Sequence, residues 1–233
     1  MSKIEWTGQT WNPLAGCTIV SPGCTNCYAM RMAARLEAMG DAAVKAGKTV
    51  PSPHYAGTTK WVNGHPVWTG KVALASDRVL TEPLRVRKPT TWFVNSMSDL
   101  FHESVPDEWI DRVFAVMAAT CDGSQTGRPQ HTYQVLTKRS ERMRAYMTTP
   151  HRESIIDEAV ARLANDHFSA EPPSKRPRSP FFGGVDNWPL PNVWLGVSAE
   201  DQRRADERIP DLLATPAAVR FVSAEPLLSR LDL

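Results

Sequence analysis

The sequence predicts an α/β fold in which about six parallel strands alternate with helices in a single domain, residues 1–233. Three observations predict this class. Short continuous apolar runs recur along the chain, as in parallel strands that are buried on both faces. Amphipathic helical patterns separate most of these runs. With 233 residues, 42% of them hydrophobic, the chain is long enough for one large core. Such units form either a barrel or an open, doubly wound sheet.

The chain begins with a predicted strand ahead of Cys17, followed by a loop that carries thiols and then by a helix. Pro22 and Gly23 indicate a turn within the loop. Residues 28–39 are mostly helix formers, and Gly40 is the expected end of this helix. The loop therefore connects the first strand to the first helix.

Residues 40–70 are predicted to form a long loop insertion after the first helix, because glycine and proline recur there. The insertion contains one hairpin, residues 60–68, which turns at Asn63-Gly64-His65.

Further apolar runs of strand length follow at residues 72–75, 91–94, 133–136, 193–197 and 219–222. Helical patterns cover residues 106–119, 140–147, 152–164 and 201–213. Residues 165–191 break this alternation, because they are rich in proline, serine and charge. We predict a flexible loop there.

Three of the four cysteines, Cys17, Cys24 and Cys27, follow the spacing C-x6-C-x2-C. Three thiols on one loop can converge on one inorganic centre. A structural zinc ion takes four ligands, thiolate and imidazole among them. A [4Fe-4S] cluster is also held by thiolates, and with three of them one iron stays open for a small molecule. Spacing alone does not separate the two. The candidate fourth ligands for zinc are His54, His65 and His102.

Small polar and acidic residues recur where the predicted strands end. The tetrapeptide Val-Ser-Ala-Glu occurs at residues 197–200 and again at 222–225. The carboxyl ends of parallel strands form the functional face of α/β folds, so these residues are expected to surround one mouth beside the cysteine loop. The expected set is Asp77, Asp99, Glu200 and Glu225, with Asn95, Ser96, Ser198 and Ser223 below them and Lys138 beside them. In the alternative, each serine or acid caps the next helix.

Charge and targeting signals restrict the function only loosely. The net charge of +2 neither requires nor excludes nucleic acid. No signal peptide opens the sequence and no apolar run approaches the length of a membrane span. We therefore expect reduced cysteines in a cytoplasmic protein. The last strand leaves no room for a covering helix, so its edge is expected to be exposed or covered by a protein partner.

Seven motifs are spread over nearly the whole chain: residues 4–7 (IEWT), 11–13 (WNP), 23–29 (GCTNCYA), 93–101 (FVNSMSDLF), 134–139 (QVLTKR), 194–198 (WLGVS) and 221–227 (FVSAEPL). Together they resemble a phage-associated three-cysteine family of uncharacterised function. That family is similar in turn to the radical S-adenosylmethionine enzymes. The resemblance implies a partial (β/α)6 TIM-like barrel, shortened here at its C-terminus.

The resemblance also implies an iron–sulfur enzyme. Cys17, Cys24 and Cys27 would hold a [4Fe-4S] cluster that reductively cleaves S-adenosylmethionine. The substrate is left open, with a nucleic acid or nucleotide as the expected class. The expected cofactor-binding residues are Tyr28, Asn95, Ser96 and Ser198, and the expected catalytic residues are Lys138, Asp99, Glu200 and Glu225. The alternative is a non-catalytic module, stabilised by zinc or a cluster, that binds nucleic acid or a protein partner.

Overall fold

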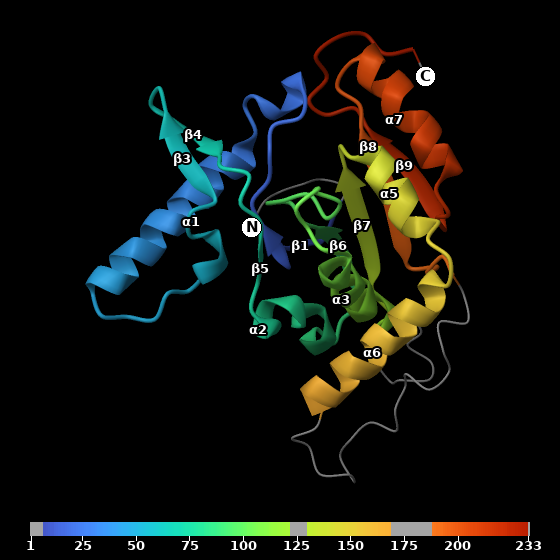
Figure 1. Cartoon of the computed structure of the whole chain (residues 1–233), viewed down its shortest axis with the longest axis horizontal. Coiled ribbons are helices and arrows are strands. Elements are labelled where there is room, and N and C mark those ends of the chain that lie inside the picture. Colours follow the sequence, from blue (N-terminus) through green and yellow to red (C-terminus); the bar gives the residue numbers. More distant parts are fainter. Residues whose placement is uncertain (1–6, 122–129, 169–187, 233) are drawn as a thin grey trace.

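A computed structural model describes residues 7–121, 130–168 and 188–232. Its centre is a five-stranded parallel sheet in the order β1-β6-β7-β8-β9 (Figure 1). The strands are β1 (Gln9–Trp11), β6 (Thr91–Val94), β7 (Thr132–Thr137), β8 (Val193–Ser198) and β9 (Val219–Ser223). The predicted α/β class is confirmed at this level.

The strands of this sheet lie side by side in the order in which they occur along the chain. A doubly wound sheet reverses its strand order at a switch point. Because the described sheet contains no reversal, the doubly wound alternative is wrong.

The predicted count of about six parallel strands is also wrong for the described residues. The apolar run at residues 72–75 forms β5 (Ala73–Leu74), which pairs antiparallel with β2 (Leu14–Ala15) in a separate sheet. The backbone N–H of Ala75 extends this contact by donating to the Pro13 carbonyl at 2.8 Å. An apolar run indicates that a segment can form a strand. Tertiary contacts determine the strand with which it pairs and whether the pair is parallel or antiparallel.

Four helices share one hydrophobic core with the sheet: α3 (Asp107–Ala118), α5 (Ser140–Met147), α6 (Arg152–Phe168) and α7 (Gln202–Ala214). All four were predicted. Helix α6 continues through Phe168, into the segment predicted to be a flexible loop, and residues 169–187 of that segment lie outside the described residues. Within the described ranges, no helix has the length and apolarity needed to cross a bilayer.

The core explains why apolar, buried residues recur at every second position of β6, β7 and β8. Trp92 and Val94 of β6, Tyr133 and Val135 of β7, and Leu195 of β8 join the helices in one cluster. Residues of alternate parity on a strand point to opposite faces of the sheet. The helices therefore cover the face that carries these five side chains.

A second, smaller cluster lies beside the sheet, on α1 (Tyr28–Lys45) and the hairpin of β3 (Thr59–Val62) and β4 (His65–Trp68) (Figure 1). The hairpin is confirmed, and its turn residues Asn63 and Gly64 have φ angles of 49° and 77°, typical of a two-residue β-turn. Helix α1 does not end at Gly40 as predicted. Gly40 is buried inside it, where an added Cβ would lie 3.1 Å from Val50.

The remaining elements are short. They are η1 (Pro22–Cys24), η2 (Pro53–Tyr55), α2 (Asp77–Leu80) and η3 (Glu82–Arg85).

Gly196 of β8 has no space for a side chain. A Cβ there would lie 2.5 Å from the ring of Phe221, which is its neighbour on β9. We expect Gly196→Ala to lower the free energy of unfolding by about 1 kcal/mol, because the partly exposed ring must move. Denaturant unfolding measures this cost. In Gly196→Ala/Phe221→Ala the overlap is absent, so the double variant should be more stable than the sum of the two single costs predicts; strict additivity would contradict the clash.

Candidate functional site

The cysteine loop follows β1 and β2 and ends at α1. Gly16, just before Cys17, has a φ of 90°, and a Cβ there would overlap the Lys71 carbonyl oxygen. The loop closes through η1, and Cys27 is the N-cap residue of α1. The thiols of Cys17, Cys24 and Cys27 are all partly buried and form no disulfide. The predicted position of the loop, between the first strand and the first helix, is confirmed.

The thiols lie among polar and cationic groups. Cys17 Sγ is 3.7 Å from a guanidinium nitrogen of Arg139, and Cys24 Sγ is 3.7 Å from Ser21 Oγ. Burial, reinforced by the Asp99 carboxylate, raises the pKa of Cys17 to about 12 although Arg139 opposes the shift. Burial also raises the pKa of Cys27. Coordination to a metal ion reverses this balance, because a thiol loses its proton when it binds a metal.

Asp99 connects the cysteine loop to the end of β7. Its carboxylate accepts four hydrogen bonds, from Thr137 Oγ1 at 2.7 Å, Arg139 Nη1 at 3.0 Å, Phe101 N at 3.0 Å and Lys138 N at 3.1 Å. The side chain is buried. Both carboxylate oxygens are thus occupied by donors of the protein.

Arg139 extends this network to the loop. Its guanidinium donates to Thr18 Oγ1 at 2.6 Å and to Glu103 Oε1 at 2.9 Å, besides contacting Asp99. On the other side of Thr18, His102 Nε2 lies 3.1 Å from the same hydroxyl. The pKa of His102 is lowered by burial and by Arg139. The segment next to Cys17 is therefore held by a buried cation.

Glu200 forms a second buried ionic group, at the end of β8. Its Oε2 accepts from Arg208 at 2.8 Å and pairs with Lys138 Nζ at 3.4 Å. Burial opposes ionisation, but Ser21, Lys138 and Arg208 outweigh it and lower the pKa of Glu200 to about 2. Oε1 is buried and has no hydrogen-bond partner among the described residues. The carboxylate packs on the cysteine loop, since a Cβ on Gly23 would lie 3.0 Å from its carbon.

Asn95 and Ser96, at the end of β6, form hydrogen bonds with the segment that precedes the cysteine loop and with the first residue of α1. Asn95 has a φ of 59°, and its Oδ1 accepts from Leu14 N at 3.2 Å while its Nδ2 is buried without a partner among the described residues. Ser96 Oγ donates to Asn12 Oδ1 at 3.0 Å, and its carbonyl accepts from the Tyr28 hydroxyl at 3.0 Å. Tyr28, Asn95 and Ser96 were predicted to bind a cofactor. Their side chains form hydrogen bonds that join the end of β6 to residues 12–14 and to the start of α1.

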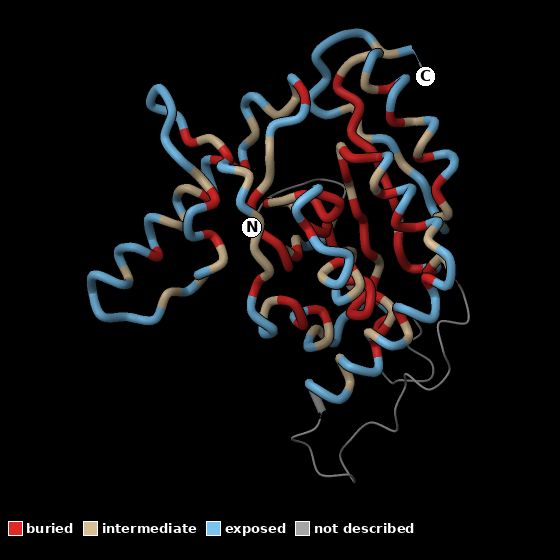
Figure 2. The backbone as a smooth tube through the Cα atoms, viewed as in Figure 1, coloured by how far each residue is buried: buried red, intermediate tan, exposed pale blue. Residues whose placement is uncertain are grey.

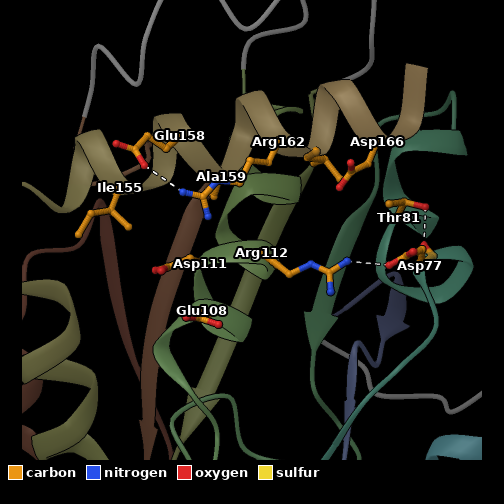
Figure 3. Close-up of a pocket in the computed structure, with 11 residues that line it drawn as sticks. Asp77, Thr81, Glu108, Asp111, Arg112, Ile155, Glu158, Ala159, Arg162 and Asp166 are labelled. Carbon is orange, nitrogen blue, oxygen red and sulfur yellow. Dashed lines mark hydrogen bonds and ion pairs between the residues drawn. The ribbon is translucent and has the colours of Figure 1, made fainter. Parts of the chain in front are cut away.

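The remaining predicted residues are placed differently. Ser198 is buried, and its carbonyl accepts from Arg208 at 2.8 Å. Glu225 is exposed after β9, without a hydrogen bond or ion pair to another described residue. Asp77 does not reach the mouth, because β5 is not part of the parallel sheet. Its carboxylate pairs with Arg112 at 2.6 Å in a separate cavity of about 340 Å³ between α2, α3 and α6 (Figure 3).

A pocket of about 800 Å³ opens beside the cysteine loop, between α5 and α7. It is lined by six basic side chains, Lys138, Arg139, Arg142, Arg203, Arg204 and Arg208, and by four acidic ones, Glu103, Glu141, Glu207 and Asp211. Val20 of the cysteine loop forms part of its wall. All six basic side chains already form ion pairs with carboxylates of the protein. An anionic group next to the thiols would therefore compete with these carboxylates for the cations.

Sequence reasoning did not identify Arg139 and Arg208 as site residues. Arg139 stands in a basic run that resembles an exposed surface, and Arg208 lies within a helix rich in charge. Arg139 is the last residue of the motif at residues 134–139 and follows Lys138, whereas the signal for Arg208 is its closeness in the chain to Glu200. Both side chains are buried against carboxylates.

The donor set suits a thiolate-bound centre, because one loop carries three thiols that form no disulfide. Arg139 beside Cys17 and Lys138 beside Cys27 act against the burial that raises the pKa of these two thiols, but burial outweighs them. Within the residues that the structure describes, no three His, Cys, Asp or Glu side chains lie close enough together to hold a single metal ion. This finding concerns a single metal ion; in a [4Fe-4S] cluster the three thiolates would bind three different irons.

Comparison with known proteins identifies a family. No curated protein and no solved structure matches the chain. One family model, described as a protein of unknown function (DUF5131), matches residues 1–233. The match includes the cysteine loop, the carboxyl ends of the parallel strands and the basic pocket. The chain therefore belongs to the DUF5131 family.

Proposed function

We propose that the protein is an iron–sulfur enzyme of the radical S-adenosylmethionine type, with a [4Fe-4S] cluster held by Cys17, Cys24 and Cys27. The observation that carries the proposal is a loop with three free thiols beside the carboxyl ends of β6, β7 and β8. Such a cluster, when bound, supplies the electron that cleaves the sulfonium of S-adenosylmethionine.

The chain's own residues have separate parts in this proposal. Lys138 would contact the carboxylate of S-adenosylmethionine, because its ammonium group is partly exposed and lies beside the loop. Glu200 would accept a hydrogen bond on Oε1, for which no described residue donates at hydrogen-bond distance, although Ser21 is close enough to lower the pKa of this carboxylate. Asn95 would donate from its unpartnered Nδ2. Asp99 and Arg139 would act by positioning the loop, since their polar atoms already bind one another.

The arrangement of the strands supports a partial barrel as the finer description of the fold. Neighbouring strands are consecutive along the chain and parallel, as they are in (β/α) barrels. We propose a TIM-like partial barrel with β9 at its open edge, a place where a protein partner would bind.

The basic pocket supports a nucleotide or nucleic acid as the substrate class. Six basic side chains line it against four acidic ones, and phosphate groups are recognised by arginine and lysine. A phosphate would have to displace some of the carboxylates with which these six cations pair. The wall formed by Val20 would bring such a substrate next to the thiols.

One observation favours a second candidate, a non-catalytic module stabilised by zinc. His102 is buried and its Nε2 lies 3.1 Å from Thr18, the residue that follows Cys17. Three cysteines and one histidine are a known ligand set of structural zinc. Such a module would bind nucleic acid or a protein without catalysis.

The test is anaerobic purification and reconstitution, followed by a visible spectrum and by iron, sulfide and zinc analysis. We expect absorption near about 400 nm with about four irons per chain, and loss of both in Cys24→Ala. The matched control is Cys121→Ala, because Cys121 lies after α3 and away from the loop; it should keep the cluster. Cleavage of S-adenosylmethionine under dithionite then tests the chemistry. A colourless protein with one bound zinc would leave only the second candidate.

A further inference from the structure

Helix α1 presents an exposed stripe that begins at the residue after Cys27. The stripe consists of Tyr28, Arg31, Met32, Arg35 and Met39, which recur at intervals of three and four residues and therefore lie on one face of the helix. The side chains of Tyr28, Met32 and Met39 are 54%, 43% and 49% exposed. Figure 2 shows that the outer side of α1 is largely exposed along its length.

The stripe is positively charged and lacks compensating acids. Neither Arg31 nor Arg35 forms an ion pair or side-chain hydrogen bond with another described residue. The two acids of α1 point elsewhere. Glu37 turns toward the hairpin, where it accepts from Thr59 Oγ1 at 2.8 Å. Asp41 lies about 200° around the helix from Met39.

This composition is typical of a protein-binding surface. Tyrosine, methionine and arginine are enriched in protein interfaces, and lysine and acids are depleted. Methionine side chains adapt to different partners because they are flexible and polarizable. The stripe runs about 16 Å, from Tyr28 to Met39. A surface of this size is suited to the small interfaces of transient redox complexes.

We propose that this face of α1 docks an acidic one-electron carrier protein. The inference rests on the proposed function, in which cleavage of S-adenosylmethionine requires an external electron. In the docking step one electron leaves the reduced carrier and enters the cluster, which changes from the 2+ to the 1+ state, and no bond forms or breaks. The stripe suits this delivery because its first residue, Tyr28, is adjacent to Cys27. An acidic surface on the carrier would complement Arg31 and Arg35.

The test uses the reconstituted full chain and an acidic flavodoxin as the probe. We expect Arg31→Glu/Arg35→Glu to weaken flavodoxin binding by about tenfold or more at low salt, and added salt to weaken binding to the unmodified chain. The control, Arg87→Glu/Lys88→Glu, makes the same charge change in an exposed segment before β6 and should leave the affinity within about twofold. Met32→Ala/Met39→Ala should weaken binding without altering its dependence on salt.

Two readouts separate this proposal from the one on which it rests. Dithionite should reduce the cluster equally well in every variant, whereas reduction by flavodoxin should be slowed only in the α1 variants. If the cluster is present but flavodoxin binds all variants equally, the docking proposal alone is overturned. If the reconstituted chain holds no iron, both proposals fail. Binding of a single-stranded oligonucleotide that the α1 charge reversal abolishes, without flavodoxin binding, would overturn docking in favour of a nucleic-acid surface.

Discussion

Asp99→Ala is expected to lower the free energy of unfolding by about 3 to 5 kcal/mol, the cost of breaking a buried ion pair by removing one partner. The Asp99 carboxylate accepts four hydrogen bonds and pairs with Arg139 at 3.0 Å, with both side chains buried. Without Asp99, the Arg139 guanidinium loses its buried partner, and the backbone donors of Phe101 and Lys138 lose their acceptor. Urea unfolding, followed by circular dichroism, measures the loss.

The matched control for this substitution is Asp77→Ala. Asp77 also pairs with an arginine, Arg112, but the Asp77 side chain is 82% exposed. Exposed pairs of this kind contribute about 1 kcal/mol or less. We expect Asp99→Asn to fall between the two, because it keeps one acceptor oxygen and loses the charge. If Asp99→Ala costs no more than Asp77→Ala, the buried network does not hold the cysteine loop.

Glu200→Gln is expected to lower the free energy of unfolding at neutral pH by about 3 kcal/mol. This loss should become smaller as the pH falls. The pKa of Glu200 in the folded protein is about 2, below its ordinary value of 4.5. The carboxylate therefore contributes its full stabilisation above pH 4.5 and loses it as the pH falls toward 2. The stability difference between the unmodified chain and Glu200→Gln should shrink over that interval. Unfolding curves at a series of pH values between about 2 and 7 measure it.

Glu225→Gln is the control for this series. The second Val-Ser-Ala-Glu tetrapeptide places Glu225 in the same local sequence as Glu200, yet Glu225 is exposed. Its substitution should change stability by about 0.5 kcal/mol or less at every pH. A pH-independent difference between Glu200→Gln and the unmodified chain would show that Glu200 contributes through packing and not through its charge.

The two tetrapeptides also show how far sequence could predict the site. Both follow strands, as their apolar runs indicated, and the strand assignments at β6, β7, β8 and β9 are confirmed. Identical sequence nevertheless gave a fully buried, doubly paired carboxylate at Glu200 and an exposed one at Glu225. The difference arises because the cysteine loop and α7 cover the end of β8.

By itself, the sequence determined the α/β class, the helices and strands of the central sheet, the hairpin turn at Asn63-Gly64 and the loop that carries Cys17, Cys24 and Cys27. These depend on local periodicity, turn chemistry and spacing, which each segment contains. Only the tertiary structure decided that β5 pairs antiparallel outside the sheet, and that Arg139 and Arg208 pair with buried carboxylates. Such pairings join residues that are distant in the chain, and their energies depend on burial. A local sequence pattern therefore cannot predict them.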